Sequence, residues 1–293
     1  DALFNELEFR RMAEQFDAIF RKGETAPVVD EAKLYKKPQP KTEEQFDLFG
    51  SAIDEGSDEA RHQYYKTLEN TTHSYQIIQG DLGIKLLLQN LQNQTSVCFD
   101  TETTGLDALH AELVGISFSY EKGKGFYIPF PENQAEAQSL VEKLIPFFEN
   151  ENIEKIGQNL KYDLKVLSNY GITVKGKLFD TMIAHYLINP DMRHNMDILS
   201  ETYLKYAPQS IEVLIGKKGK NQKSMREVPL EEIKEYAVED ADVTLQLAEI
   251  FNTELDKTHT KKLFEEIEIP LVTVLASMEK EGINLDVPFL QSL

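Results

Sequence analysis

The chain has 293 residues, 41% of them hydrophobic, which is enough for about two domains with a sizeable core. Its one cysteine, Cys98, excludes a disulfide framework and a zinc site built from several cysteines. The formal net charge of −19 argues against a protein whose main task is to hold duplex DNA, because phosphate neutralisation favours basic surfaces.

The sequence also lacks a run of about 18 apolar residues and the charged-then-apolar order of a signal peptide. We therefore expect a soluble, cytoplasmic protein without a membrane partner.

The first 72 residues predict two different segments. Residues 1–21 form an amphipathic helical pattern, with apolar residues at spacings of three and four, and no cap precedes it. We expect this helix to be the end of a domain truncated upstream. Residues 22–72 lose the periodicity and place several prolines among charged residues, which predicts an extended linker.

One apolar cluster interrupts this linker. Three large apolar side chains occur in the stretch Gln45, Phe46, Asp47, Leu48 and Phe49. Either the stretch is kept for a binding partner, or it folds back onto its own domain.

A folded module is predicted from about residue 73. Strands are expected at 74–78, 96–103, 112–120 and 126–130, and the last three of these form an antiparallel meander. A helix over 133–149, a strand at 155–157 and a helix over 160–170 follow, and the chain is then mostly helical to 255. This order predicts an α/β fold, a mixed sheet with helices packed on it. Residues 267–293 start an apolar helix, turn at Gly282 and stop in mid-pattern, as if cut from something larger.

The strand at 96–103 carries the first candidate site. Asp100 and Glu102 are two residues apart and therefore point to the same face of the strand. Two carboxylates held so close repel each other unless a cation lies between them, which favours a divalent metal site. The alternative is a polar strand end that runs into a turn at Gly105.

Two later positions could complete such a site. Asp163 falls in the first turn of a helix, where an acid can also be no more than a partner of the helix dipole. Tyr236 and Asp240 are four residues apart and share a helix face, whereas Glu239 and Asp242 point elsewhere.

Taken together, these motifs resemble a known family. FDTETTGLD, GQNLKYD and YAVEDADVTLQL are similar to the three motifs of the DEDD 3′–5′ exonucleases in their tyrosine-bearing branch, and specifically to the proofreading domain of the bacterial DNA polymerase I family. The resemblance covers about residues 73–258 and implies an RNase H-like fold with a mixed five-stranded sheet flanked by helices.

The flanking segments extend the resemblance. LFNELEFRRM is similar to the end of that family's 5′-nuclease domain, and IPLVTVLASMEKEGINLD is similar to the opening of its polymerase domain. The implied layout is a 5′-nuclease tail (1–21), a linker (22–72), an exonuclease domain (73–258) and the start of a polymerase domain (259–293).

The resemblance also implies the chemistry. Two divalent cations, Mg²⁺ or Mn²⁺, would be held by four carboxylates. Asp100 would bridge both ions, Glu102 and Asp240 would complete the site that activates water, and Asp163 would serve the leaving-group side. Tyr236 would orient the attacking water.

The same resemblance assigns partners and binding residues. The substrate would be a single-stranded or frayed DNA 3′ end, Thr103 and Leu106 would contact its terminal nucleotide, and the strand would be held by Gln158, Asn159, Tyr162 and Arg193. The remainder of a polymerase chain would supply affinity for duplex DNA, in a monomer associated with the bacterial nucleoid. Residues 45–49 resemble the Q-L-[SD]-L-F peptide that binds the sliding clamp, although Phe46 stands where leucine is usual.

Two other functions fit parts of this pattern. An RNA-trimming exonuclease of the ribonuclease D type would use the same carboxylates and tyrosine, but a helical nucleic-acid-binding domain would follow it. A non-catalytic segment would use the domain as a scaffold and a tether for the clamp.

Overall fold

The computed structural model describes residues 65–217, 219 and 222–292. The predicted helix at 1–21, most of the predicted linker and the apolar cluster at 45–49 lie outside these residues. Within the described part of the chain, no helix has both the length and the apolar character needed to cross a membrane.

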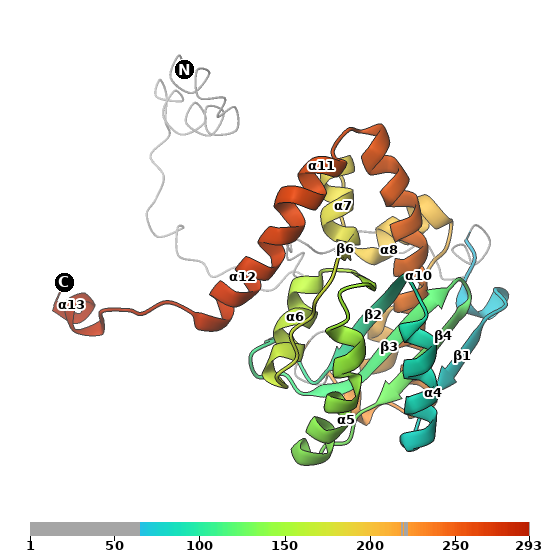
Figure 1. Cartoon of the computed structure of the whole chain (residues 1–293), viewed down its shortest axis with the longest axis horizontal. Helices are drawn as coiled ribbons and strands as arrows, with labels where there is room; N and C mark the ends of the chain where they lie inside the picture. Colours follow the sequence, from blue (N-terminus) through green and yellow to red (C-terminus); the bar gives the residue numbers. More distant parts are fainter. Residues whose placement is uncertain (1–64, 218, 220–221, 293) are drawn as a thin grey trace, which may run out of the picture. The chain divides into compact units, whose positions relative to one another are not determined.

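The centre of the fold is a mixed sheet of six strands (Figure 1). In chain order the strands are β1 (Ser74–Ile77), β2 (Ser96–Thr103), β3 (Leu113–Glu121), β4 (Lys124–Pro129), β5 (Glu154–Gly157) and β6 (Leu178–Asp180), and they lie side by side in the order β1-β4-β3-β2-β5-β6. The pairs β2–β3 and β3–β4 are antiparallel, which confirms the predicted meander, and the other pairs are parallel.

The predicted α/β class is confirmed, but the expectation of five strands was one too few. β6 has three residues, which is too short for a periodic pattern to show in the sequence. It becomes a strand because it pairs with β5, from Lys155 opposite Leu178 to Gly157 opposite Asp180.

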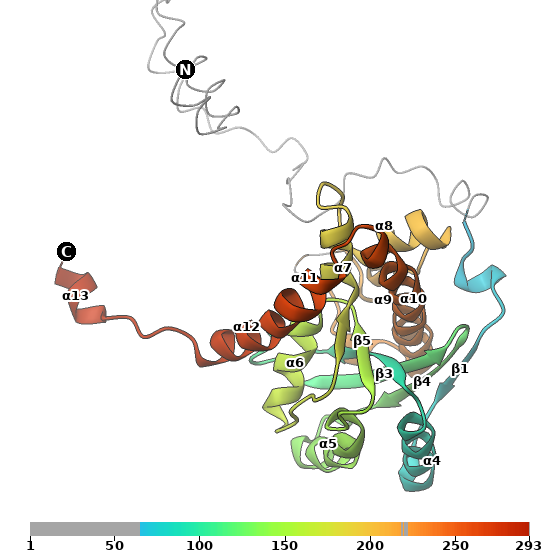
Figure 2. The same cartoon turned by 45° about the horizontal axis from the view of Figure 1, so that its top comes forward.

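Helices cover both faces of the sheet (Figure 2). The long helix α10 (Leu230–Lys257) lies across one face, and α4 (Gly80–Gln92) and α5 (Gln134–Phe148) lie together on the other. The remaining helices are α6 (Leu160–Asn169), α7 (Thr181–Ile188), α8 (Met196–Leu199), α9 (Ile211–Ile215), α11 (Lys261–Leu263), α12 (Ile269–Glu281) and α13 (Val287–Ser292), with short 3-10 or π turns at Leu68–Asn70, Ser200–Leu204, Met225–Glu227 and Phe264–Glu268.

Aromatic side chains form the core on the α5 face. Phe118 of β3 packs edge-on against Phe147 with ring centroids 5.4 Å apart, and Phe99 of β2 packs in the same way on Phe148 at 5.2 Å. All four side chains are fully buried. This packing holds β2 from the α5 side of the sheet. The opposite face of the strand is therefore available for polar residues.

On the other face, small residues bring α10 close to the sheet. Ala237 and Ala241 are fully buried. A Cβ placed on Gly125 of β4 would lie 2.3 Å from Cγ1 of Val238 and 2.8 Å from the carbonyl oxygen of Phe118, so this contact requires glycine. The close approach sets the position of the residues that follow Ala237 along α10.

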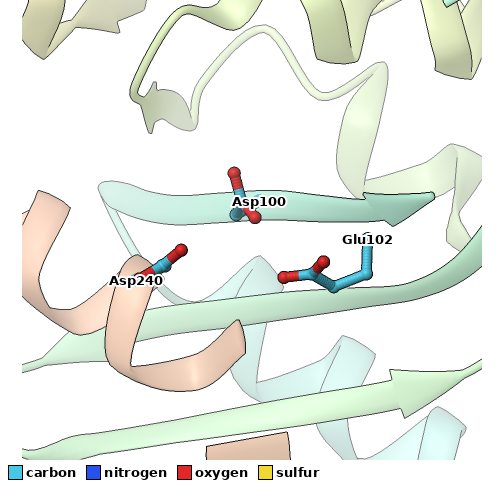
Figure 3. Close-up of side chains that lie close together, drawn as sticks. All are labelled: Asp100, Glu102 and Asp240. Carbon is cyan, nitrogen blue, oxygen red and sulfur yellow. The ribbon is translucent and has the colours of Figure 1, made fainter. Parts of the chain in front are cut away.

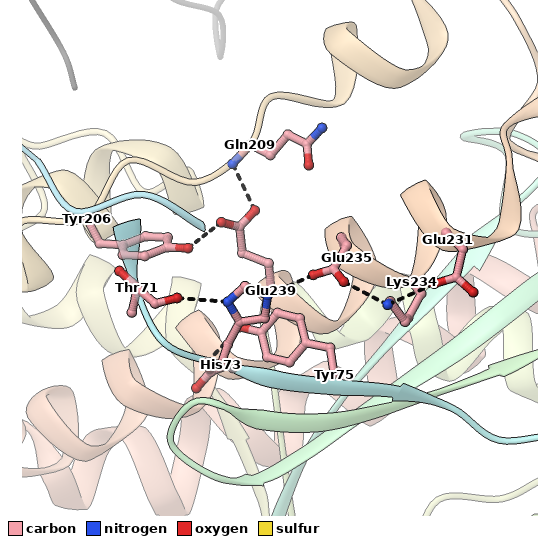
Figure 4. A network of polar contacts seen from close by, with 10 residues as sticks. Thr71, His73, Tyr75, Tyr206, Gln209, Glu231, Lys234, Glu235 and Glu239 are labelled. Carbon is pink, nitrogen blue, oxygen red and sulfur yellow. Dashed lines mark hydrogen bonds and ion pairs between the residues drawn. The ribbon is translucent and has the colours of Figure 1, made fainter. Parts of the chain in front are cut away.

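Two acidic residues of α10 anchor neighbouring segments. The carboxylate of Glu239 accepts hydrogen bonds from the Tyr206 hydroxyl and from the backbone N–H of Gln209, the latter at 2.9 Å (Figure 4). Asp242 accepts from the Tyr75 hydroxyl at 2.8 Å and from the N–H of Gly123 at 3.0 Å. Both residues therefore point away from Asp240, as the sequence predicted.

Residues on both sides of the predicted 73–258 module contact it. Lys66 pairs with the segment at 205–207 through backbone hydrogen bonds of 2.9 and 2.8 Å. Phe264 is buried against Phe179, with ring centroids 4.9 Å apart, and α12 is joined to α6 by ion pairs of 2.6 Å from Lys161 and Lys165 to Glu279. Residues after the predicted C-terminal boundary thus contribute to the core, and Lys66 before the N-terminal boundary adds a backbone contact.

Candidate active site

Three carboxylates meet between β2 and α10 (Figure 3). Asp100, Glu102 and Asp240 each have one carboxylate oxygen that lies within 4.8 Å of the corresponding oxygens of the other two. Asp100 and Glu102 share a face because strand side chains alternate, and this face is the one that α10 covers. The structure therefore brings the first predicted pair together with Asp240, across 140 residues of sequence.

The position of Glu102 is set by an irregularity in the sheet. The register of β2 against β3 shifts between Glu102 and Thr103, and such bulges redirect side chains at strand ends. Gly115 lies opposite Glu102, and a Cβ there would lie 1.9 Å from the hydroxyl oxygen of Tyr127. The Tyr127 ring fills this space, and its hydroxyl donates to the carbonyl of Val114 at 3.3 Å.

Asp163 approaches the same strand from α6. Its Oδ1 accepts hydrogen bonds from the N–H of Thr101 at 3.2 Å and from the Thr101 hydroxyl at 2.5 Å. The side chain is 3% exposed. Asp163 is thus beside the cluster, but it is not one of the three residues whose oxygens lie within 4.8 Å of one another.

A second buried acid holds the start of α6. The carboxylate of Asp180 accepts from the N–H groups of Asn159 at 3.3 Å and Leu160 at 2.7 Å, and it also caps α7 through Met182 and Ile183 at 2.9 and 3.2 Å. Asn159 has a left-handed backbone with φ of 58°. Because one carboxylate ties two helix N-termini to the end of β6, the turn that carries Asp163 is fixed.

The clustered acids strongly disfavour one another's charge. Burial raises the pKa of Asp100, Asp163 and Asp240 well above the ordinary range, and the neighbouring carboxylates raise it further. Burial first and then Asp163 raise the pKa of Glu102 to about 8. Such a group of carboxylates is costly to ionise without a compensating cation.

The residues present fit a hard divalent cation. Oxygen ligands from several carboxylates are what Mg²⁺ and Mn²⁺ prefer. Among the described residues, Oδ1 of Asp240 is buried and has no hydrogen-bond partner. A metal ligand position would explain why this oxygen is left without a protein donor.

Tyr236 lies one turn before Asp240 on α10. Burial raises the pKa of its phenol well above the ordinary value, with further contributions from Asp240, Glu102 and Asp100. The hydroxyl therefore stays protonated at neutral pH and can donate a hydrogen bond at the edge of the acidic cluster.

The loop after β2 places two of the predicted substrate residues. The Thr103 hydroxyl is 2.5 Å from the Tyr162 hydroxyl, which itself donates to the carbonyl of Gly105 at 2.5 Å. Leu106 follows this fixed turn and is 89% exposed. The solvent-exposed apolar side chain of Leu106 is therefore available for contact with a ligand.

The other predicted substrate residues lie around the start of α6. Gln158 donates through Nε2 to the carbonyl of His194 at 2.8 Å, and its Oε1 accepts from the Thr181 hydroxyl. Asn159 is exposed, and so is Arg193, which makes no hydrogen bond or ion pair with the described residues. Residues 158, 159 and 193 are thus brought to one region through the contact between Gln158 and His194.

Sequence reasoning missed the residues that hold these groups in place. Thr101, Asp180 and Thr181 form the contacts that fix Asp163 and Gln158, but each contact spans at least 20 residues. The pair Asp180-Thr181 between a short apolar stretch and a helix is a recognisable capping signal for α7. Its second role at α6 has no local pattern.

Comparison with known proteins decides the family. The family model for the 3′–5′ exonuclease matches residues 75–256. This chain belongs to the 3′–5′ exonuclease family. The family predicted from the three motifs is therefore confirmed, and the exonuclease motifs all fall within the matched range.

Bacterial DNA polymerases are among the relatives of this exonuclease. DNA polymerase I of Borreliella burgdorferi is 31% identical over 285 residues, an alignment that covers 96% of this chain and 30% of the relative. DNA polymerase I of Chloroflexus aurantiacus is 36% identical, with coverage of 74% of this chain and 23% of the relative. The chain thus spans less than a third of the length of either polymerase.

Solved structures share the fold of this exonuclease at low sequence identity. The POL domain of Pol1 from M. smegmatis, in complex with DNA primer-template and dNTP, aligns with a TM-score of 0.59 at 20% identity, over 74% of this chain and 34% of that one. Escherichia coli RNase D, an exoribonuclease involved in structured RNA processing, aligns with a TM-score of 0.55 at 17% identity, over 71% and 51%. These likenesses support the RNase H-like fold.

Proposed function

We propose that this exonuclease removes nucleotides from single-stranded or frayed DNA 3′ ends as the proofreading module of a bacterial DNA polymerase. Water attacks the phosphorus of the last phosphodiester, the bond from phosphorus to the 3′ oxygen breaks, and the products are a 5′-mononucleotide and a strand with a new 3′ hydroxyl. The observation that carries the proposal is the convergence of Asp100, Glu102 and Asp240, with Asp163 and Tyr236 beside them.

The acidic cluster is proposed to hold two divalent cations, Mg²⁺ or Mn²⁺. When bound, such a pair lowers the pKa of a water molecule and stabilises charge on the attacking and leaving oxygens. Asp100 would contribute to both positions, Glu102 and Asp240 to the position of the attacking water, and Asp163 to the position of the leaving group. Thr101 keeps Asp163 oriented through its two hydrogen bonds.

Tyr236 would orient the attacking water. Its raised pKa keeps the phenolic proton in place, so the residue acts as a hydrogen-bond donor and not as a base. Its position on α10, one turn before Asp240, directs that donor at the face where the water would be held.

Residues at the rim would hold the DNA end. The exposed side chain of Leu106 would wedge against the terminal base, with Thr103 beside it on a turn that Tyr162 fixes. Gln158, Asn159 and Arg193 would contact the strand on the α6 side.

Mononucleotide release tests this proposal. Wild-type protein with Mg²⁺ is expected to release 5′-mononucleotides from a 3′-end-labelled single-stranded oligonucleotide, and Asp100→Ala is expected to lower the rate by at least about 10²- to 10³-fold. Asp81→Ala, which removes an exposed carboxylate that pairs with Lys143, is the matched control and should retain full activity. Absence of release by the wild type, or full release by Asp100→Ala, would contradict the proposal.

Relative rates on DNA and RNA oligonucleotides of one sequence separate this function from RNA trimming of the ribonuclease D type. Preference for DNA is expected, and a clear preference for RNA would favour the alternative. Calorimetric titration with Mn²⁺ separates both enzymes from a non-catalytic scaffold, because a scaffold need not bind metal at these carboxylates.

We also propose partners that fit a polymerase. Residues Gln45, Phe46, Leu48 and Phe49 would bind the sliding clamp, and the protein would act as a monomer associated with the nucleoid. Fluorescence polarisation of a labelled 40–52 peptide titrated with the clamp tests the first point. Saturable binding supports it, and no saturation below millimolar clamp rejects it.

A further inference from the structure

An exposed aromatic side chain lies next to the proposed strand-binding residues. Tyr186 of α7 is 54% exposed. Its ring meets the ring of His194 at an angle of 76°, with centroids 5.4 Å apart. A large aromatic ring that is open to solvent on one side and supported on the other can accept a planar group.

The support under Tyr186 is rigid. Nδ1 of His194 is 2.7 Å from Nδ1 of His185, a fully buried side chain whose Nε2 is 3.1 Å from the Tyr203 hydroxyl. The carbonyl of His194 accepts the 2.8 Å hydrogen bond from Gln158. His194 is therefore fixed through both its ring and its backbone, and Tyr186 rests on a part of the chain that does not have to be ordered on binding.

The same contacts make this surface continuous with the acidic cluster. Gln158 follows β5 directly and precedes α6, whose first turn carries Asp163. Arg193 is adjacent to His194 and exposed, without an ion-pair partner among the described residues. An aromatic ring, a cation and the turn that is proposed to hold the DNA strand thus lie in one connected arrangement.

The charge of the chain makes stacking the more useful interaction here. With a net charge of −19, the protein gains little from long-range attraction to phosphates. Stacking of bases on aromatic rings does not depend on net charge, and it tolerates any base because every base has a π face.

We propose that Tyr186, supported by His194, stacks with a base of the single-stranded substrate at least two nucleotides to the 5′ side of the terminal nucleotide, while Arg193 contacts a phosphate between the two positions. The occupant is the substrate strand itself, so this inference rests on the proposed function and deepens it. It predicts that the exonuclease grips several nucleotides and not only the terminal one.

Dependence on substrate length tests this inference. For oligo(dT) of four or more nucleotides, Tyr186→Ala is expected to raise KM about 5- to 100-fold with little change in kcat, from the usual strength of base–aromatic stacking. The effect should shrink towards the dinucleotide, which has only the terminal nucleotide and its immediate 5′ neighbour and therefore lacks the base that stacks on Tyr186. Tyr186→Phe keeps the ring and should have the wild-type KM. Leu82→Ala, which truncates an exposed apolar side chain on the distant helix α4, should leave KM and kcat unchanged.

Salt dependence separates stacking from charge. Arg193→Ala should reduce the slope of log Kd against log salt by about 0.7, as expected for the loss of one phosphate contact on a single strand, whereas Tyr186→Ala should weaken binding without changing the slope. Binding of labelled oligo(dT) in EDTA gives this measurement without hydrolysis.

Failure of the stacking inference and failure of the proposed function give different results. An active wild type with a Tyr186→Ala variant whose KM is unchanged, or is raised equally for dinucleotides and longer strands, would overturn the stacking inference alone. An inactive wild type would overturn the proposed function. In that case the binding measurement in EDTA still decides the inference, because equal affinities of wild type and Tyr186→Ala for oligo(dT) would reject it.

Discussion

Asp240 shows at the scale of one residue what the acidic cluster costs the fold. The residue is 8% exposed, one oxygen of its carboxylate has no hydrogen-bond partner among the described residues, and carboxylate oxygens of Asp100 and Glu102 lie within 4.8 Å. Buried polar atoms in proteins are almost always hydrogen bonded, so exceptions of this kind point to function. In the absence of metal, the cluster is expected to destabilise the folded state.

Asp240→Asn should therefore stabilise the metal-free protein while it removes activity. Replacing one of the mutually repelling carboxylates with an amide is expected to raise the free energy of unfolding in EDTA by about 1–3 kcal/mol, since each unit of pKa perturbation corresponds to about 1.4 kcal/mol. Urea denaturation measures this change. Asp256→Asn, at an exposed ion pair with Lys261, is the control and should stay within about 0.5 kcal/mol. A lower stability of Asp240→Asn in EDTA would contradict the account.

The pKa of Glu102 predicts how stability depends on pH without metal. Its folded pKa is raised from 4.5 to about 8, so the folded chain binds this proton more tightly than the unfolded chain. The contribution of Glu102 to stability is then present below pH 4.5 and is lost as the pH rises to about 8, with a slope of up to about 1.4 kcal/mol per pH unit. In EDTA, urea denaturation between pH 5 and 8 should show a steeper loss of stability for the wild type than for Glu102→Gln. Parallel curves for the two proteins would reject the raised pKa.

Among the elements, those with long periodic patterns could be predicted, and those made by pairing could not. The meander and the helices over 133–149 and 160–170 match β2–β4, α5 and α6 closely, because alternation and helical spacing are local properties. β6 and the contacts of residues 65–72 depend on partners far away in the sequence.

The candidate site divides in the same way. The carboxylates could be found because strand alternation pairs Asp100 with Glu102 and helix spacing pairs Tyr236 with Asp240. The packing of α10 on the sheet brings Asp240 to Asp100, and the packing of α6 turns Asp163 towards Thr101. Neither contact follows from local spacing. The positioning role of Asp180 follows from packing as well, and no spacing rule predicts it.

The double capping by Asp180 can be measured. Asp180→Ala should lower the free energy of unfolding by about 1–4 kcal/mol, because acceptors for the N-termini of both α6 and α7 are lost and each cap contributes about 0.5–2 kcal/mol. Asp180→Asn keeps one acceptor oxygen and should cost clearly less. Urea denaturation in the presence of Mg²⁺ compares the two variants, and equal losses would show that hydrogen bonding by this side chain is not what holds the helices.

At the scale of the whole molecule, the segment after α10 belongs to the same packed unit as the sheet. Phe264 is 2% exposed against Phe179, and Val272 and Ala276 of α12 are buried in the same core. The sequence of 259–293 resembles the start of a polymerase domain. That resemblance is compatible with residues of this segment packing on the exonuclease core and stabilising it.

Truncation of Phe264 tests this coupling. Phe264→Ala should destabilise the protein by about 3–5 kcal/mol, the usual cost of removing a buried aromatic ring, in a single unfolding transition. Leu263→Ala, at the neighbouring residue with 38% exposure, should cost less than about 1 kcal/mol. A small effect of Phe264→Ala, or a separate transition for the C-terminal segment, would show that it is not part of the core.

The central claim is that Asp100, Glu102, Asp163 and Asp240 form a metal centre for phosphodiester hydrolysis. Anomalous diffraction from crystals soaked in Mn²⁺ tests it most directly. Two peaks about 3.5–4 Å apart, each coordinated by oxygens of these four residues, are the predicted result. An anomalous difference map with Mn²⁺ peaks elsewhere in the crystal but none at these four carboxylates would contradict the account.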